Sequence, residues 1–524
     1  QGWAEEDGTW VYYDKNGDKV TESWKKSGDN WYWLDDNGEM ATDLLVEDDD
    51  NYYYVDANGA MVRNQWVAIE NEDAGEDDEP EHYWYYFQAN GKAYKSSDSS
   101  SSVSTKTING KKYIFDDEGR MMYGWINAEG DRETDEDTDW QTGVYYAGDE
   151  DDGALRTNEW ALISVKDDGA DSAQPGDDFW DEDQERWFWF KASGKKQTSD
   201  NDDDDAIKVK KINGKKYGFD RYGRMVASWY SQLGVASITN ASVSQSEKTD
   251  SFMYFSSPED GARYAKGWFK VVPGYYLNAD NYNDDADKWF YADSNGKLAS
   301  SEIKKIKGKR YAFDQYGRMI SGLVFLQMNS DTEIASKYAD DDATHPYDTE
   351  DGFDEFTEFH RPDILTGNIR SYYFGSSDDG SMKTGKQNVS IDGESITFKF
   401  ETGSARKGVG LNGIDDDKAY VAGKQIKADK DDKYKVVEIE KIDGVEYIKD
   451  EMTVAEFLGL NLVDEVPNDD GDRIWDFTGN DDAKNYRVIN SSGAVIKKKS
   501  SAKDGDDYKL TINNKVITKI VLEN

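Results

Sequence analysis

Short aromatic segments alternate with turn-forming residues along most of the chain, and this pattern predicts β-hairpins. The segments WVYY (10–13), WYWL (31–34) and YYYV (52–55) are each followed by four residues that end in Asn-Gly. Asn-Gly tolerates the positive φ values that tight hairpin turns require. We therefore predict that each aromatic strand turns at its Asn-Gly and pairs with the segment that follows. Two further turns of this kind stand at 88–91 and 293–296.

One eighteen-residue stretch occurs three times. INGKKYIFDDEGRMMYGW (108–125) recurs as INGKKYGFDRYGRMVASW (212–229) and as IKGKRYAFDQYGRMISGL (306–323). In the first copy we predict a strand at 113–115, a turn at 116–119 and a return strand from Arg120. Two other hairpin types recur between the copies, so three hairpins form a super-repeat of roughly a hundred residues.

The repeats divide the chain into three predicted regions. Residues 1–66 hold hairpins with short spacers, residues 67–404 hold the super-repeats with long acidic loops, and residues 405–524 form a divergent, β-rich C-terminal domain. In the last region we predict a short helix within 452–462, in which Thr453 is the N-cap and Glu456 completes a capping box. A closing hairpin within 508–522 is predicted to turn across Asn513 and Asn514.

Composition limits both the core and the partners. The chain is 14% aromatic but only 36% hydrophobic, which favours many thin aromatic cores over one thick aliphatic core. A formal net charge of −45 argues against nucleic acid and against an anionic membrane surface. The charge suits cationic ligands or a divalent metal, or it serves solubility alone. The chain has no Cys, which excludes disulfides, and it begins at Gln1, which suggests a processed or truncated chain.

These hairpins resemble a known repeat family. GTWVYYDKNGDKVTESW (8–24) resembles the choline-binding or cell-wall-binding repeat, and INGKKYIFDDEGRMMYGW (108–125) resembles the related glucan-binding and clostridial-toxin repeat. The resemblance extends over about residues 2–404. It implies an all-β solenoid of stacked hairpins, a left-handed superhelix with about three hairpins per turn. It also implies a secreted or cell-surface protein of a Gram-positive bacterium.

In the choline-binding relatives, aromatic residues of consecutive hairpins form a cage for a quaternary ammonium, through cation–π attraction. The resemblance carries this role to three sets of residues: Trp24, Trp31 and Tyr53; Trp3, Trp10 and Tyr32; and Trp66 with Trp84, where a sixteen-residue acidic insertion (67–82) separates the two rings. The alternative is that these rings only form the core.

Later hairpins depart from the pattern. The GW dipeptide of the family is EW at 159–160 and GL at 322–323, and each departure removes a wall of the cage. We assign the repeated tyrosines and phenylalanines to the core rather than to a ligand: Tyr113, Phe115, Tyr217, Phe219, Tyr311 and Phe313.

Metal and catalytic motifs are weak. The acidic runs at 47–51 and 202–205 suit either solvated loops or Ca²⁺, without the spacing of a dedicated calcium loop. His345 and His360 lie among carboxylates in a long insertion, which predicts either a metal site or a surface loop. The sequence has no HExxH, GxSxG or phosphate-binding loop, so we predict no enzyme and no cofactor.

Two functions remain open. The first is a non-catalytic surface protein that binds choline-bearing wall teichoic acid or glycans, with avidity from repeated weak sites. The second is a structural rod or fibre subunit that self-assembles through its Lys-rich C-terminal region. No apolar run approaches the roughly 20 residues that a transmembrane helix needs.

Overall fold

The computed structural model describes residues 1–97, 102–166, 184–203, 206–341 and 344–524, and these residues are mostly β-structure. They form two compact units. The first unit comprises Gln1–Ile238 and Met253–Tyr264, and the second comprises Thr239–Phe252 and Ala265–Asn524. The predicted boundaries near residues 66 and 404, and the predicted superhelix, remain predictions. No helix in the described ranges is both long and apolar enough to cross a membrane.

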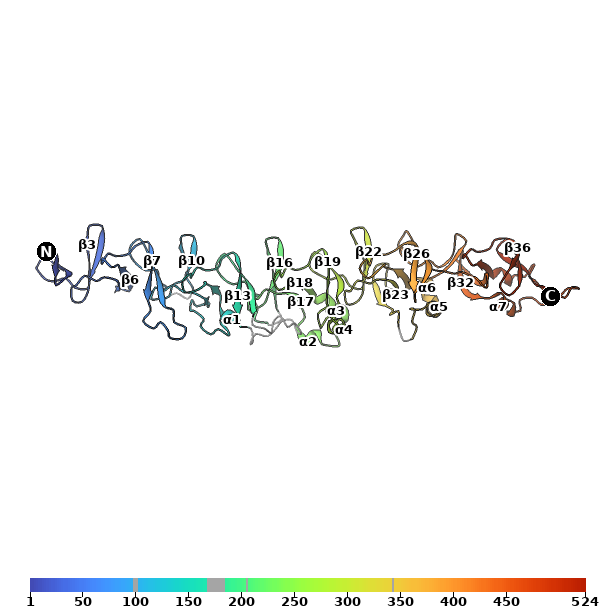
Figure 1. Cartoon of the computed structure of the whole chain (residues 1–524), viewed down its shortest axis with the longest axis horizontal. Helices are drawn as coiled ribbons and strands as arrows, with labels where there is room; N and C mark the ends of the chain where they lie inside the picture. Colours follow the sequence, from blue (N-terminus) through green and yellow to red (C-terminus); the bar gives the residue numbers. More distant parts are fainter. Residues whose placement is uncertain (98–101, 167–183, 204–205, 342–343) are drawn as a thin grey trace. The chain divides into compact units, whose positions relative to one another are not determined.

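The first unit is a series of two-stranded antiparallel hairpins that follow one another in chain order (Figure 1). Its hairpins are β1–β2, β3–β4 and so on to β17–β18. The strands are β1 (Gly2–Glu6), β2 (Thr9–Tyr13), β3 (Ser23–Ser27), β4 (Asn30–Leu34), β5 (Leu44–Asp48), β6 (Asn51–Val55), β7 (Gln65–Glu70), β8 (His82–Phe87), β9 (Lys106–Ile108), β10 (Lys111–Tyr113), β11 (Trp125–Ile126), β12 (Tyr145–Tyr146), β13 (Glu159–Val165), β14 (Gln184–Phe190), β15 (Lys208–Ile212), β16 (Lys215–Phe219), β17 (Ser228–Ser231) and β18 (Phe252–Phe255), with short helices α1 (Asp139–Thr142) and α2 (Val235–Ile238).

The hairpins exist as predicted, but they turn at different residues. Strand β2 pairs with the strand before it, across Asp7 and Gly8, which have φ values of 50° and 85°. The predicted turn at 14–17 follows the hairpin instead. There Asp14 accepts hydrogen bonds from the backbone N–H groups of Asn16 and Asp18, and only Gly17 has positive φ. The side chain of Asp14 therefore stabilises a linker turn, not a hairpin turn.

The same correction applies to the repeated stretch. Strand β10 pairs with β9 across Asn109 and Gly110, both with positive φ. The predicted return strand from Arg120 is reduced to a single bridge between Phe115 and Met121. Because turn residues stand on both sides of each aromatic strand, the local pattern does not decide which neighbour pairs with it.

The second unit begins with the same hairpins and ends in larger sheets. Its sheets are β19–β20, β21–β22, β24–β23–β25, β26–β27–β30–β29–β28, β32–β31–β35 and β33–β34–β38–β37–β36. The strands are β19 (Gly267–Val271), β20 (Lys288–Ala292), β21 (Glu302–Ile306), β22 (Lys309–Phe313), β23 (Leu323–Met328), β24 (Ile334–Lys337), β25 (Ile369–Tyr373), β26 (Gly385–Ile391), β27 (Glu394–Phe400), β28 (Gly413–Asp415), β29 (Lys418–Val421), β30 (Lys424–Gln425), β31 (Tyr434–Ile442), β32 (Val445–Met452), β33 (Glu465–Pro467), β34 (Arg473–Asp476), β35 (Tyr486–Asn490), β36 (Lys499–Lys503), β37 (Lys509–Asn513) and β38 (Val516–Leu522). The helices are α3 (Gln245–Ser251), α4 (Ala279–Asn283), α5 (Glu350–Phe359), α6 (Arg361–Thr366), α7 (Val454–Gly459) and the 3₁₀ helix η2 (Asp482–Asn485).

Two predictions for the C-terminal region can be compared with these elements. Helix α7 begins after Thr453, and the capping box of Thr453 with Glu456 is present, as predicted. The closing hairpin β37–β38 exists, but it turns at Asn514 and Lys515, whose φ values are 49° and 67°, one residue later than predicted. The later turn keeps Ile512 and Ile517 buried on the core side of the sheet.

The insertion that contains His345 and His360 forms helices α5 and α6. Phe356 of α5 stacks on Phe325 of β23, with ring centroids 4.2 Å apart, and both rings are fully buried. The imidazole of His345 stacks on Phe359 at 4.0 Å, and the centroids of the two histidine rings lie 5.9 Å apart. The insertion thus covers an aromatic core cluster with two helices, whereas the sequence predicted either a metal site or a small loop.

Candidate ligand-binding site

One backbone hydrogen bond recurs between consecutive hairpins of each unit. A residue in the linker after one hairpin donates its N–H to the second strand of the preceding hairpin. Met40 donates to the carbonyl of Trp10 over 2.8 Å, and Met319 donates to that of Trp289 over 2.9 Å. Because this bond fixes the stacking distance and register, side chains at equivalent positions of each stacked pair come together.

Among the described residues, this bond assembles five sets of a first-strand Trp, a second-strand Trp, a Tyr of the next hairpin and a linker Met. We call them cages 1 to 5. In chain order they are Trp3, Trp10, Tyr32 and Met40; Trp24, Trp31, Tyr53 and Met61; Trp66, Trp84, Tyr113 and Met121; Trp160, Trp187, Tyr217 and Met225; and Trp268, Trp289, Tyr311 and Met319.

Cage 1 surrounds a cavity of about 310 Å³, which is lined by Trp3, Trp10 and Tyr32 together with Met40, Ser27 and Asn58. The sequence predicted this aromatic trio. The rings of Trp3 and Tyr32 are 5.6 Å apart at 75°, and Trp10 is 45% exposed. The indole N–H of Trp3 is buried and has no hydrogen-bond partner within the described structure. Cage 1 therefore offers aromatic walls and one unused donor.

Cage 2 has the same composition with one polar change. The rings of Trp24 and Tyr53 lie 5.1 Å apart at 62°, while Trp31 is 38% exposed. Asp48 stands where cage 1 has Ser27, and its Oδ2 accepts a hydrogen bond of 3.2 Å from Trp24 Nε1. The predicted trio of Trp24, Trp31 and Tyr53 thus occupies the positions of the cage 1 residues, with a carboxylate beside it.

Cages 3, 4 and 5 have nearly the same geometry. The two Trp rings are nearly perpendicular at 6.5, 6.2 and 6.3 Å, and the first-strand Trp lies 4.9, 4.8 and 4.8 Å from the Tyr. In cage 3 the insertion at 67–82 lengthens the loop between β7 and β8. Residues Gln65–Glu70 and His82–Phe87 still pair, so Trp66 and Trp84 are not separated as the sequence suggested.

Sequence reasoning missed cages 4 and 5. The change from GW to EW at 159–160 keeps Trp160, which is the ring that forms the wall. The repeated phenylalanines are buried, as predicted. Tyr113, Tyr217 and Tyr311 are half-buried and pack against the same core clusters, and each also stands beside the cage tryptophans. The signal that could have found these cages is a Trp directly before a Phe in the second strand, Trp187 before Phe188 and Trp289 before Phe290.

Carboxylates approach two further cages from the loops of later hairpins. Asp151 accepts a hydrogen bond of 3.1 Å from Trp84 Nε1 and lies 2.8 Å from His82 Nε2. Asp378 accepts one of 3.2 Å from Trp289 Nε1 and pairs with Lys270 Nζ at 3.1 Å. The indole of Trp84 and then His82 lower the pKa of Asp151, and the indole of Trp289 and then Lys270 lower that of Asp378. Both groups are therefore anionic at neutral pH.

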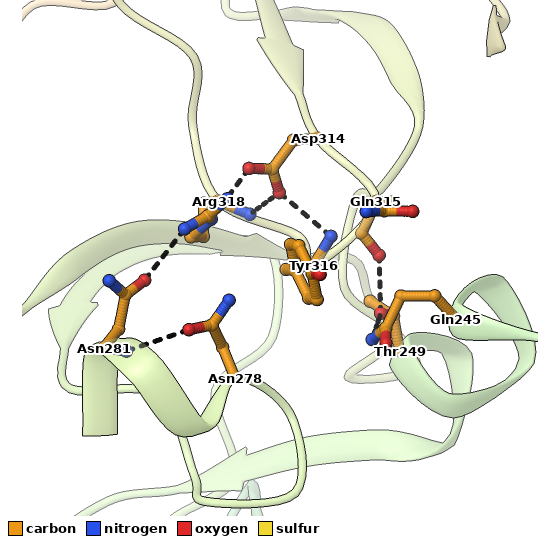
Figure 2. A network of polar contacts seen from close by, with 8 residues as sticks. All are labelled: Gln245, Thr249, Asn278, Asn281, Asp314, Gln315, Tyr316 and Arg318. Atoms are coloured by element: carbon orange, nitrogen blue, oxygen red, sulfur yellow. Dashed lines mark hydrogen bonds and ion pairs between the residues drawn. The ribbon is translucent and has the colours of Figure 1, made fainter. Parts of the chain in front are cut away.

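A polar network in the second unit fixes the linker of cage 5, and Figure 2 shows its members. Thr249 of α3 donates to the carbonyl of Gln315 over 2.6 Å. Arg318 donates from Nε to Asp314 over 2.7 Å and from a terminal nitrogen to Asn281 of α4 over 2.9 Å. Since Met319 follows Arg318 directly, the network positions the methionine of the cage.

Asp116, in the turn of the first repeated stretch, is expected to make the stability of the folded chain depend on pH. Burial raises the pKa of Asp116 to about 6, although backbone N–H groups and Arg120 oppose this shift. A raised pKa means that the folded chain favours the protonated form. The associated stability is complete below about pH 4 and is lost as the pH rises through 6. Melting temperatures from pH 4 to 7 should therefore fall more steeply for the native chain than for Asp116→Asn, and equal slopes would contradict the shift.

No group of three or more His, Asp or Glu side chains in the described part of the chain is arranged to hold a metal ion. The acidic run at 47–51 contains the turn of hairpin β5–β6, where Asp49 and Asp50 have positive φ. The run at 202–205 lies partly outside the described residues. A role for Ca²⁺ remains a prediction of the sequence alone.

Two segments of the chain match known repeat families. Residues 20–66 match the choline-binding repeat, and residues 282–298 match a cell wall binding repeat. The first segment contains Trp24, Trp31 and Tyr53 of cage 2, and the second contains Trp289 of cage 5. The resemblance seen in the sequence is confirmed for these segments. No curated protein matches the chain.

Three similar solved structures are from Streptococcus pneumoniae. CbpJ is 17% identical, with 74% of this chain and 99% of that chain covered and a TM-score of 0.35. Choline binding protein F, solved with a peptidoglycan analogue, is 18% identical, with 78% and 98% covered and a TM-score of 0.31. The modular autolysin LytC, solved with a synthetic peptidoglycan ligand, is 15% identical, with 63% and 56% covered and a TM-score of 0.31. This chain thus spans about half of LytC.

Proposed function

We propose that this protein attaches to the bacterial cell wall by binding quaternary ammonium groups, such as the choline of wall polymers, in its aromatic cages. The observation that carries the proposal is cage 1, whose cavity of about 310 Å³ is lined by Trp3, Trp10 and Tyr32. A cation surrounded by ring faces gains about 0.5–2 kcal/mol per ring, depending on desolvation. Such sites are individually weak, so several cages on one chain would act through avidity.

Charge and ring geometry favour a cation over a neutral sugar. Perpendicular rings, as in Trp268 and Trp289 at 85°, form a box around a small group instead of one flat platform for a sugar ring. The carboxylates of Asp48, Asp151 and Asp378 each accept a hydrogen bond from a cage indole. Negative charge beside the rings strengthens cation binding and adds nothing for a neutral ligand. We propose no catalytic role, and a cell-surface location follows from wall attachment.

A titration with matched ligands tests the proposal. We expect choline chloride to change the Trp fluorescence, and its uncharged isostere 3,3-dimethyl-1-butanol to produce a much smaller change. The physical reason is that the two molecules share a shape but only choline is attracted to the ring faces. Short glucans and chito-oligosaccharides serve as the glycan comparison. A folded chain that ignores choline up to about 50 mM, where a millimolar site is saturated, would refute the proposal.

Lys270 is expected to weaken cage 5. Its ammonium lies 5.9 Å from the ring centroid of Trp289 and pairs with Asp378, so it competes with an external cation for both groups. The change Lys270→Ala should raise the choline affinity of this cage roughly two- to fivefold, the range expected for one exposed ion pair. The resonance of 5-fluorotryptophan at Trp289 follows this cage alone. The exposed Lys305→Ala variant, with the same change in net charge, should leave that affinity unaltered.

A further inference from the structure

The interface between hairpins β11–β12 and β13–β14 of the first unit contains a lysine where the cages have methionine. The N–H of Lys196 donates to the carbonyl of Val144 over 2.7 Å, which is the stacking bond that Met40 and Met319 make in cages 1 and 5. Glycine and polar residues surround Lys196 in the linker, yet its own side chain is only 5% exposed. The stacking bond therefore places the Lys196 side chain where the cages have their linker Met.

The other members of this interface also correspond to a cage. Trp125 occupies the place of the first-strand Trp, and Phe188 occupies that of the Tyr, with ring centroids 5.2 Å apart at 73°. Val144 stands where the cages have the second-strand Trp. Its missing ring is replaced by Trp140 of α1, which is fully buried and lies 6.4 Å from Phe188. An inserted helix thus restores an aromatic enclosure.

The ammonium of Lys196 lies inside this enclosure. Its Nζ donates to the carbonyl of Trp140 over 2.6 Å and lies 3.5 Å from that of Gln141, at the C-terminal end of α1. The same nitrogen is 5.2 Å from the ring centroid of Trp125 and 5.8 Å from that of Phe188. Burial lowers the pKa of Lys196 to about 7, Asp220 and Asp139 raise it, and Arg224 lowers it. Below pH 7 the ammonium form therefore predominates.

We propose that Lys196 is the resident cation of a sixth aromatic cage, which its own ammonium fills and closes to external ligands. The inference rests on the proposed function of the open cages and extends it. Two carbonyl oxygens and two ring contacts bind this ammonium in the manner of a primary-amine ligand. The interface thereby becomes a fixed joint between two hairpins, while cages 1 to 5 remain open to quaternary ammonium groups.

Chemical rescue tests this inference. In Lys196→Ala at pH 6, the enclosure loses both the stem and the charge of the lysine. We expect added n-butylammonium to raise the melting temperature of this variant by at least about 2 °C more than that of the native chain. Uncharged n-butanol should not do so. The neighbouring exposed Lys195→Ala variant, which keeps the resident ammonium, should respond like the native chain.

The outcomes are distinct. An equal response of the native chain and Lys196→Ala to n-butylammonium overturns the inference. If that variant does not fold, crystals of the native chain soaked in choline give a second measurement. Choline in the open cages but not beside Trp125 supports the inference, and choline between Trp125 and Phe188 overturns it. Choline in no cage refutes the proposed function instead. The role of Lys196 is then decided by whether n-butylammonium, and not n-butanol, restores folding of Lys196→Ala, and no restoration overturns the inference.

Discussion

Replacing the five second-strand tryptophans by alanine is expected to abolish retention of the chain on a choline-substituted resin. The residues are Trp10, Trp31, Trp84, Trp187 and Trp289. Each change removes one wall of a cage, which costs roughly 1–2 kcal/mol of binding, or about five- to thirtyfold in affinity per site. Because retention depends on several weak sites at once, these losses multiply, and an avidity gain of about 10² or more disappears.

The folded structure should tolerate these five changes, because none of the second-strand rings is fully buried and those of cages 1 and 2 are exposed. Trp10 and Trp31 are 45% and 38% exposed. By contrast, the first-strand Trp268 contacts Trp289, Tyr291, Tyr311 and Phe313. Far-UV circular dichroism and thermal melting of the variant should therefore show a cooperative transition close to that of the native chain.

A matched variant tests whether retention depends on the cage rings or on exposed apolar side chains in general. Leu44, Tyr275 and Phe359 are 43%, 40% and 63% exposed and belong to no cage. Their combined replacement by alanine should leave retention on the resin unchanged. If the five-tryptophan variant stays folded and is retained like the native chain, the rings serve packing only, which is the structural-rod alternative considered from the sequence.

The hairpins and the aromatic residues of cages 1 and 2 were predictable from the sequence because both depend on short-range patterns. Trp3, Trp10 and Tyr32 could be assigned to one site since the family motif fixes their order within two adjacent hairpins. The hairpin turns were not predictable in the same way. Asp7-Gly8 and Asn16-Gly17 flank the same strand, and the choice between them depends on stacking against the next hairpin, which is a tertiary interaction.

Contacts between residues far apart in the chain could also not be predicted from the sequence. Asp151 reaches Trp84 across two intervening hairpins, and Asp378 reaches Trp289 across 89 positions. Nothing in the local composition of those acidic loops distinguishes the aspartate that meets an indole from its solvated neighbours. The burial of Lys196 could not be predicted for the same reason, because it depends on helix α1, which carries Trp140.

The second large effect expected is a loss of stability on replacing the Arg of the ion pair in the repeated stretch. The three copies of this stretch place the same pair in three different environments. Each copy carries Asp and Arg four residues apart in the turn. Asp220 and Arg224 form an ion pair of 2.6 Å with side chains only 2% and 1% exposed. Arg224→Met removes the partner of a buried carboxylate while keeping much of the apolar stem. Removing one partner of a buried ion pair costs about 3–5 kcal/mol, so local stability around β15–β16 should fall by up to that amount, less whatever the nearby Lys196 compensates.

The other two copies provide internal controls for the same change. Asp314 and Arg318 pair at 2.7 Å with 10% and 27% exposure, and Asp116 and Arg120 pair at 3.5 Å with 27% and 28% exposure. The Asp side chains of these copies are less completely buried than that of Asp220, and Asp116, whose pKa is about 6, can take up a proton when its partner is removed. We expect Arg120→Met to cost less than about 1 kcal/mol and Arg318→Met an intermediate amount.

Native-state hydrogen exchange of peptides from each hairpin measures the three local free energies under one condition. The expected order of destabilisation is Arg224, then Arg318, then Arg120, which follows burial and not sequence. Arg224 is the buried member because Trp140 covers it, with the guanidinium 5.4 Å from the indole centroid. Equal losses at all three turns would mean that the turn geometry common to the copies, and not the environment built by the inserted helix, sets the energy of the pair.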